Sequence, residues 1–377
     1  MKNNEDLTPR ERVNFSLSHK TADRVPLDFG GHVSGIHNIA YRKLLDFLGR
    51  DFETEIYEIE QQLVQINEEI LEEFSIDTRY VHIKFRISDV YSNHDADFYT
   101  DEWGVIKYKK RGGYFFELYK SPLENAGIGD VENYEWLDEI NAARYNGLRE
   151  KAKCFATKGF AVITNLQGIF EKAWELRGIQ NMFEDLIANQ EFVEVLFEKI
   201  LSVYKKIYGY FLDICGEFLD IVQITDDLGT QDSLLMSPFL YRRLLKPRHK
   251  ELVDFIKDKT PARIAIHTDG SMMPLIEDLI EVGFEVLNPV QVSAKDMDTR
   301  ELKEKYGNRL SFWGAIDTQW VLPFGSTQDV RNEVIRRISD LGRNGGYILA
   351  PVHNILPEVP PENIWTMFDT ARTLVIR

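Results

Sequence analysis

The stretch Ala262-Arg-Ile-Ala-Ile-His267-Thr-Asp269-Gly270 joins a short apolar run to two candidate metal ligands. Its centre, residues 264–266, predicts a buried strand, and the polar residues follow directly. His267 and Asp269 lie two positions apart, so an extended chain points both side chains to the same face. Gly270 then permits a turn into a predicted helix. The stretch therefore predicts a strand that delivers reactive side chains at its carboxyl end.

The same alternation of a buried strand and a helix recurs along the chain. Apolar runs predict strands near residues 25, 78, 160, 220, 264, 285, 311 and 347. Several of these runs are apolar throughout, as expected of parallel strands covered on both faces. Such a series in 377 residues predicts one α/β domain, a (β/α)8 TIM barrel over residues 1–377. A doubly wound open sheet is the alternative, but no GxGxxG or P-loop motif follows any strand.

Some segments add to this repeat. The sequence Thr8-Pro9-Arg10-Glu11 has the pattern of a helix start with a capping box, which predicts an N-terminal helical extension. Residues 52–75 are acidic and have a helical apolar stripe. Residues 84–120 are aromatic and rich in glycine, which predicts a small β-hairpin insertion. A helix is predicted over 136–156 after it.

Composition narrows the classes of partner. The net charge of −16 disfavours nucleic acid and anionic lipid surfaces. No apolar run approaches the roughly 18 residues that span a bilayer, and the first residues lack the apolar core of a signal peptide. Cys154 and Cys215 are far apart, which predicts neither a disulfide framework nor a thiolate metal site. We therefore expect a cytoplasmic protein.

Polar residues gather at the predicted strand ends, which in a barrel converge on the active site. They are His32, Asn165, Gln167, Asp226, Asp227, His267, Asp269, Asn288, Gln291, Asp317, Gln319, His353 and Asn354. Part of this polarity is expected anyway, because strand ends leave the core and Asp and Asn often cap helices.

His267, Asp269 and His353 have the composition of a three-ligand metal site with an open fourth position. Nitrogen and carboxylate ligands suit Zn²⁺ best, with Fe²⁺, Mn²⁺ or Co²⁺ as alternatives. The adjacent pair Asp226-Asp227 offers an acid, a base or a partner for a ligating histidine. Asp227 could equally be a helix cap.

Several stretches resemble the uroporphyrinogen decarboxylase superfamily over nearly the whole length of the chain. They are TPRERV at 8–13, RVPLDFGG at 24–31, DDLGTQ at 226–231, HTDG at 267–270, LNPVQ at 287–291, FWGAIDTQ at 312–319 and GGYILAPVHNILPEVPPENI at 345–364. The resemblance implies a (β/α)8 barrel, in agreement with the predicted strands.

The superfamily holds two chemistries, and this sequence departs from the patterns of both. Decarboxylases carry an arginine-bearing stretch after the first strand, whereas residues 29–34 here contain no arginine. Binding a substrate with many carboxylates would then be electrostatically poor. Cobalamin-dependent methyltransferases carry zinc ligands as H-x-C and a later Cys; His267, Asp269 and His353 stand at the similar positions here. Replacing both thiolates makes the site harder and disfavours thiol substrates.

The resemblance to the methyltransferase branch implies transfer of a methyl group from a small O- or N-methylated substrate to a Co(I) corrinoid. A separate corrinoid protein is implied, because the chain has no DxHxxG cobalamin motif. Zn²⁺ would lie on the triad, and Asp226 or Asp227 would act as the catalytic acid or hydrogen-bond partner. The expected substrate contacts are His32, Asn165, Gln167, Gln291 and Trp313, with 84–120 shaping the pocket. The alternatives are a metal-free decarboxylase and a non-catalytic corrinoid-binding barrel.

Overall fold

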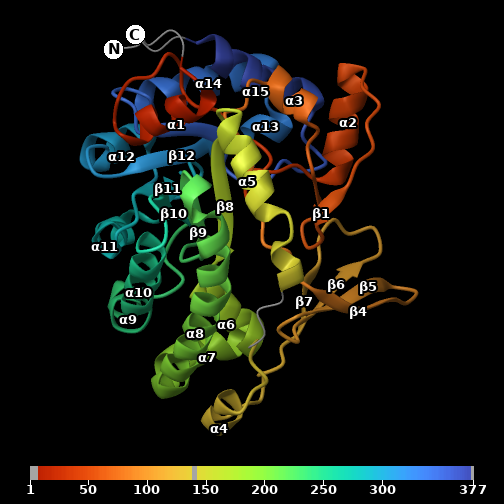
Figure 1. Ribbon diagram of the computed structural model, residues 1–377, viewed down its shortest axis with the longest axis vertical. Coiled ribbons are helices and arrows are strands. Elements are labelled where there is room, and N and C mark those ends of the chain that lie inside the picture. The colour runs from red at the N-terminus through yellow and green to blue at the C-terminus, as the bar shows by residue number, and fades with distance from the viewer. Residues whose placement is uncertain (1–6, 138–141, 375–377) are drawn as a thin grey trace.

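A curled parallel sheet of seven strands forms the centre of the protein, as seen in a computed structural model that describes residues 7–137 and 142–374 (Figure 1). The strand order is β13-β12-β11-β10-β9-β8-β3, so chain neighbours lie side by side. The strands are β3 Thr78–Tyr80, β8 Ala161–Gln167, β9 Ile221–Thr225, β10 Arg263–His267, β11 Val286–Asn288, β12 Ser311–Ile316 and β13 Tyr347–Pro351.

The predicted first strand near residue 25 lies between the two edges of this sheet. Leu27 forms a parallel bridge with Leu349 of β13, and the Asp28 N–H donates to the Leu349 carbonyl over 3.0 Å. On the other side, the Asp77 N–H donates to the Leu27 carbonyl over 2.9 Å. The curled sheet with this bridging segment is consistent with a TIM-barrel fold.

Side chains alternate between the inside of the curled sheet and the surrounding helices. One core cluster, here called the lumen cluster, takes alternate strand residues: Tyr80, Ala161, Ile163, Ile221, Ala265, Val286, Trp313, Ile348 and Ala350. The residues between them, such as Val162 and Leu349, belong to the larger cluster shared with the helices. This alternation tells which polar strand residues face the lumen.

Helix α1, Pro9–Leu17, closes the N-terminal end of the lumen. It begins with the predicted capping box, in which Thr8 and Glu11 bond each other's backbone N–H. Its Val13 and Leu17 side chains belong to the lumen cluster, and the Ser16 hydroxyl donates to the Tyr347 carbonyl over 2.8 Å.

Helices cover the outer face of the sheet (Figure 1). The longer ones are α2 Asn38–Leu48, α5 Leu148–Thr157, α6 Ile169–Arg177, α7 Ile179–Ala188, α8 Gln190–Cys215, α10 Lys246–Lys257, α11 Ile276–Val282, α12 Thr299–Tyr306, α14 Thr327–Leu341 and α15 Pro361–Thr373. The short ones are α3 Glu68–Glu73, α4 Ile128–Glu132, α9 Pro238–Leu240 and α13 Val321–Phe324.

Two predicted helices are wrong in extent. The 52–75 region is helical only in α3; before it, β1 Ile56–Glu58 pairs with β2 Leu63–Val64. Leu63 also bridges to His37, so pairing with distant backbone replaced the helix that its spacing favours. The helix predicted over 136–156 is replaced by a short 3-10 helix, Ala142–Tyr145, followed by α5, and its residues 138–141 lie outside the described part.

The insertion forms a four-stranded antiparallel sheet instead of one hairpin, and it projects to one side of the main sheet (Figure 1). Its strands are β4 Ile87–Ser92, β5 Ala96–Asp101, β6 Ile106–Lys110 and β7 Glu117–Lys120. Lys107 anchors it through ion pairs to the partly exposed Glu60 over 2.7 Å and to the buried Glu175 of α6 over 2.5 Å.

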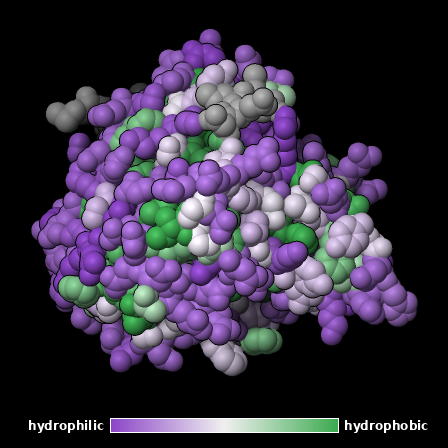
Figure 2. All heavy atoms as spheres, turned by 90° about the horizontal axis from the view of Figure 1, so that it is seen from below, coloured by the Kyte–Doolittle hydropathy of each residue, from purple (hydrophilic) through white to green (hydrophobic). Residues whose placement is uncertain are grey.

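The surface is mostly hydrophilic on the face that Figure 2 shows, with small separate apolar patches (Figure 2). This agrees with the 106 charged side chains, 45 basic and 61 acidic. Among the helices of the described residues, none is long and apolar enough to cross a membrane.

The buried Asp77 carboxylate stabilises the place where the bridging segment joins the sheet. It accepts hydrogen bonds from Arg12 over 2.5 Å, from Arg24 over 2.7 Å and from the Leu27 N–H over 2.8 Å.

Asp77→Ala is expected to lower the free energy of unfolding by roughly 3–5 kcal/mol, because two arginines lose a buried partner. Urea denaturation measures this loss. The control Asp369→Ala, which breaks a partly exposed pair with Arg372, should lose less than about 1 kcal/mol; equal losses would contradict this role.

Candidate metal centre

His267, Asp269 and His353 come together at the carboxyl ends of β10 and β13. One potential ligand atom from each residue lies within 4.8 Å of the other two. The strands β10 and β13 are separated by β11 and β12 in the sheet. The curl of the sheet therefore brings together side chains that are 86 positions apart in the chain, from 267 to 353.

The two histidines offer ring nitrogens as potential ligands. His267 is only 3% exposed, and its Nδ1–H donates to Asn288 Oδ1 over 2.6 Å, which leaves the Nε2 lone pair for a metal. Burial lowers the pKa of His353 to about 4, against a smaller opposing effect from Asp269. His353 is thus neutral near pH 7 and able to bind a cation.

The Asp269 carboxylate could supply a third ligand, and hydrogen bonds of the adjacent backbone hold it in place. Its N–H donates to Asp227 Oδ1 over 2.8 Å, and the next N–H, of Gly270, donates to Gln291 Oε1 over 2.6 Å. Asp269 Oδ1 is buried and has no hydrogen-bond partner among the described residues. A buried, unpaired carboxylate oxygen is costly unless a cation meets it. This donor set fits Zn²⁺.

Acidic side chains surround the triad on the β9 side. Burial, together with the nearby Asp269 carboxylate, raises the pKa of Asp227 to about 6. Glu171, in the first turn of α6, has its pKa raised by burial and by Asp227 and Asp226. The sequence did not single out Glu171, because it lies within a helix and its neighbours come from another strand.

Asp226 has structural contacts that Asp227 lacks. It accepts from the Phe170 and Glu171 N–H groups over 3.1 and 2.8 Å, and so caps α6. Its Oδ2 also contacts His249 Nε2 over 2.8 Å, and both side chains are fully buried. The two adjacent aspartates, interchangeable in the sequence, therefore have different neighbours: Asp226 holds α6, and Asp227 adjoins the metal triad.

The predicted substrate contacts also separate into groups. His32 lies by the triad: burial lowers its pKa, and His267 and Glu58 act on it electrostatically. Gln291 holds the Gly270 turn and donates to Gln231 over 2.7 Å. Trp313 is fully buried in the lumen cluster, where its Nε1–H donates to Asp28 Oδ2 over 3.0 Å.

Two further predicted substrate contacts, Asn165 and Gln167, lie two positions apart on the lumen side of β8. Gln167 donates to Glu175 over 3.2 Å and so joins the buried charges that anchor the insertion. The Asn165 amide bonds to the amide of Gln223 on β9. Gln223 was not predicted, although its alternation with Ile221 in an apolar strand was a signal.

His82, which the sequence did not single out, lies near His32. Its ring stacks on Tyr57 and Tyr80 at centroid distances of 5.0 and 5.5 Å. Burial lowers its pKa to about 3, and His32 contributes to the shift. The Tyr80-x-His82 alternation at the end of β3 was the available signal.

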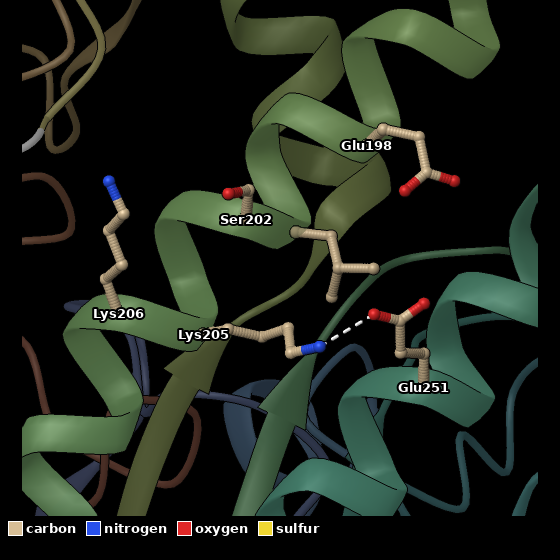
Figure 3. Close-up of a pocket in the computed structure, with 6 residues that line it drawn as sticks. Glu198, Ser202, Lys205, Lys206 and Glu251 are labelled. Atoms are coloured by element: carbon tan, nitrogen blue, oxygen red, sulfur yellow. Dashed lines mark hydrogen bonds and ion pairs between the residues drawn. The ribbon is translucent and has the colours of Figure 1, made fainter.

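A surface hollow away from these residues lies between α8 and α10 (Figure 3). Its lining is Glu198, Leu201, Ser202, Lys205, Lys206 and Glu251. Lys205 of α8 and Glu251 of α10 form an ion pair of 2.7 Å across it. Because it belongs to the outer helical layer, we do not assign the chemistry to it.

Comparison with known proteins decides the family. The family model described as uroporphyrinogen decarboxylase (URO-D) matches residues 120–374. The chain belongs to the URO-D family. A uroporphyrinogen decarboxylase from Trichodesmium erythraeum is 28% identical over 155 residues, 41% of this chain and 40% of that protein. One from Prochlorococcus marinus is 24% identical over 272 residues, 70% of this chain and 75% of that protein. The chain thus matches about two fifths of the first relative's length.

A solved structure supports the fold of this URO-D family member. The methyltransferase from Methanosarcina mazei superposes with a TM-score of 0.64 and 17% sequence identity. The match covers 97% of this chain and 99% of that protein. At this identity the likeness establishes the shared fold.

Asn288 is expected to orient the His267 ring for metal binding. Asn288→Ala should weaken Zn²⁺ affinity about 10–100-fold, because the imidazole loses the bond that fixes its tautomer and direction. Competition with a chromophoric chelator measures this affinity. The control is Gln319→Ala, whose side-chain amide oxygen accepts from Gln231 over 2.9 Å, and it should bind Zn²⁺ like the wild type. Unchanged affinity in Asn288→Ala would contradict the predicted role.

Asp226 and Asp227 should differ in their effect on stability. Asp226→Asn is expected to lower the free energy of unfolding by roughly 2–3 kcal/mol, because it weakens hydrogen bonds to a buried carboxylate. Asp227→Asn retains an oxygen for the Asp269 N–H and should lose less than about 1 kcal/mol. Denaturant unfolding of the two variants compares them directly, and an equal loss would refute the distinction.

Proposed function

We propose that this URO-D family member is a metal-dependent methyltransferase that takes a methyl group from a small O- or N-methylated compound. The acceptor in this proposal is a Co(I) corrinoid presented by a separate protein. The observation that supports it best is the triad of His267, Asp269 and His353, with one buried carboxylate oxygen unpaired among the described residues. The methyltransferase name of the Methanosarcina mazei neighbour agrees with this branch of the family.

The triad residues would hold Zn²⁺, which when bound supplies a Lewis acid that withdraws electron density from the atom carrying the methyl group. Asn288 orients His267, and Asp227 and Gln291 hold the backbone on either side of Asp269. The ligands are thus held by neighbouring hydrogen bonds, which reduces the reorganisation needed on binding.

Asp227 is the residue we propose as the proton donor. When the bond between the methyl carbon and its heteroatom breaks, the electron pair stays on the heteroatom, which then takes a proton. A pKa of about 6 leaves part of the Asp227 population protonated near neutral pH. Asp226 is already engaged with α6 and His249.

The ligand chemistry also bears on the substrate class. Two imidazoles and a carboxylate make a harder site than one with thiolates, which favours oxygen or nitrogen donors over thiols. The acidic side chains Asp227 and Glu171 nearby disfavour substrates with several negative charges. We therefore propose neutral or cationic methyl donors, such as methyl ethers and methylamines.

Decarboxylation without a metal is the second candidate, because the curated relatives are named uroporphyrinogen decarboxylase. Residues 29–34, which follow the bridging segment, contain no arginine that could bind substrate carboxylates. Turnover of a porphyrinogen by chelator-treated protein would favour this candidate over methyl transfer.

The proposal is tested by incubating the zinc-loaded protein and Co(I) cobalamin with a panel of methoxy and methylamine compounds. Formation of methylcobalamin, followed by its absorbance, is the expected result for at least one compound. His267→Ala combined with His353→Ala should abolish both transfer and bound metal by elemental analysis. His94→Ala, at an exposed histidine in the insertion, is the matched control and should retain both. Full metal occupancy in the double variant, or no metal in wild type, would overturn the proposal.

A further inference from the structure

Two amide side chains face the lumen on the β8 and β9 strands that lead toward the triad. Asn165 of β8 is in register with Gln223 of β9, and Gln223 is in register with Ala265 of β10. Ile163, Ile221 and Ala265 belong to the lumen cluster. Asn165 and Gln223 lie two residues after Ile163 and Ile221, so they face the lumen as well.

This amide pair lies one level deeper in the lumen than His267. On β10, His267 follows Ala265 by two residues and also faces the lumen, in register with Thr225. Two residues of a strand correspond to roughly 6.7 Å. Ala265, which lies beside Gln223 at the level of the amide pair and two residues before His267, has no side-chain atom beyond Cβ.

The pair leaves two polar atoms unpaired. Asn165 Nδ2 donates to Gln223 Oε1, while Asn165 Oδ1 and Gln223 Nε2 are buried with no hydrogen-bond partner among the described residues. Gln223 is fully buried, with 0% exposure. Leaving such a donor and acceptor unpaired is costly, which is the pattern of a site that a ligand completes.

The chemical character of the free atoms does not depend on how the amides are oriented. If both amides are turned over, Gln223 donates to Asn165, and the free atoms become Asn165 Nδ2 and Gln223 Oε1. In each case the pair presents one donor and one acceptor. The matching ligand group carries an acceptor and a donor side by side and has no charge, as in a primary carboxamide.

We propose that Asn165 and Gln223 bind a neutral donor–acceptor group of the substrate while its methyl-bearing atom faces the triad. The inference rests on the proposed function, whose substrate class it narrows. In a methyl ether whose oxygen is two bonds from a carboxamide carbon, the amide group can bind the amide pair while the ether oxygen faces the triad. The length of this fragment plus one hydrogen bond of about 2.9 Å is comparable to the offset of roughly 6.7 Å along the strand between the amide pair and His267. Gln223 is thereby a specificity-determining residue.

The test uses two small probes that differ by one group. Methoxyacetamide has a methyl ether and a primary amide; methoxyacetone replaces the NH₂ with a methyl group of similar size and so lacks the donor. Ligand-observed NMR titration of the zinc-loaded full chain measures both affinities. We expect the wild type to bind methoxyacetamide at least about tenfold more tightly, because an analogue lacking the donor leaves a buried acceptor unpaired.

Variants test whether the preference for methoxyacetamide over methoxyacetone depends on the amide pair. Gln223→Met keeps the length of an unbranched side chain but removes the hydrogen bond that fixes the Asn165 amide and its free oxygen, so the preference should fall below about threefold. Asn165→Leu should do the same and covers the case in which Gln223→Met does not fold. Thr164→Val is the matched control: Thr164 lies beside Asn165 and its buried hydroxyl is also unpartnered among the described residues, but its position faces the helices. This variant should retain the tenfold preference.

The outcomes separate this inference from the proposed function. Equal affinity for the two probes in wild type, no measurable binding of either, or an undiminished preference in Gln223→Met would overturn the amide-pair inference. Methylcobalamin formation is followed in the same samples with Co(I) cobalamin added. Selective, Gln223-dependent binding without methyl transfer from any compound would support the amide pair and count against the methyltransferase proposal alone.

Discussion

The candidate site depends on the curl of the parallel sheet, which the bridging segment at residues 25–28 helps to hold. This segment bonds to β13 on one side and to Asp77, just before β3, on the other. Arg12 and Arg24 form ion pairs with the Asp77 carboxylate, next to this segment. With the edges held in this way, the carboxyl ends of β10 and β13 face each other, and His267 and His353 approach within reach of one ion.

The lumen changes in character from one end to the other. Near α1 it is filled by apolar side chains and by Trp313, whose indole is tied to the buried Asp28. Further along come the Asn165–Gln223 amides, and then the histidines and acids around the triad. The apolar end contributes stability through burial, whereas the polar end holds buried unpaired atoms that lower stability. Such a division is typical of TIM barrels, whose reactive groups lie at the carboxyl ends of the strands.

The insertion is joined to the site side of the sheet by charge. Lys107 from β6 and Lys172 from α6 both pair with Glu175, and Gln167 at the end of β8 bonds to the same carboxylate. Several hydrogen bonds to the Glu175 carboxylate offset the free-energy cost of burying it. Burial by itself raises the pKa of Glu175, but the neighbouring lysines outweigh this effect and lower the pKa to about 2.

The sequence by itself determined the periodic strand–helix pattern, the capping box at Thr8 and the ligand types at the strand ends, because these follow from local spacing and side-chain chemistry. It could not determine which polar strand ends meet. Asp226 and Asp227 are chemically alike, and only packing against α6 and His249 distinguishes them. The bridge from Leu63 to His37 that accompanies the β1–β2 pairing, and the meeting of His267 with His353, join residues far apart in the chain. Tertiary structure decided these features, since such contacts join residues whose separation along the chain carries no local signal.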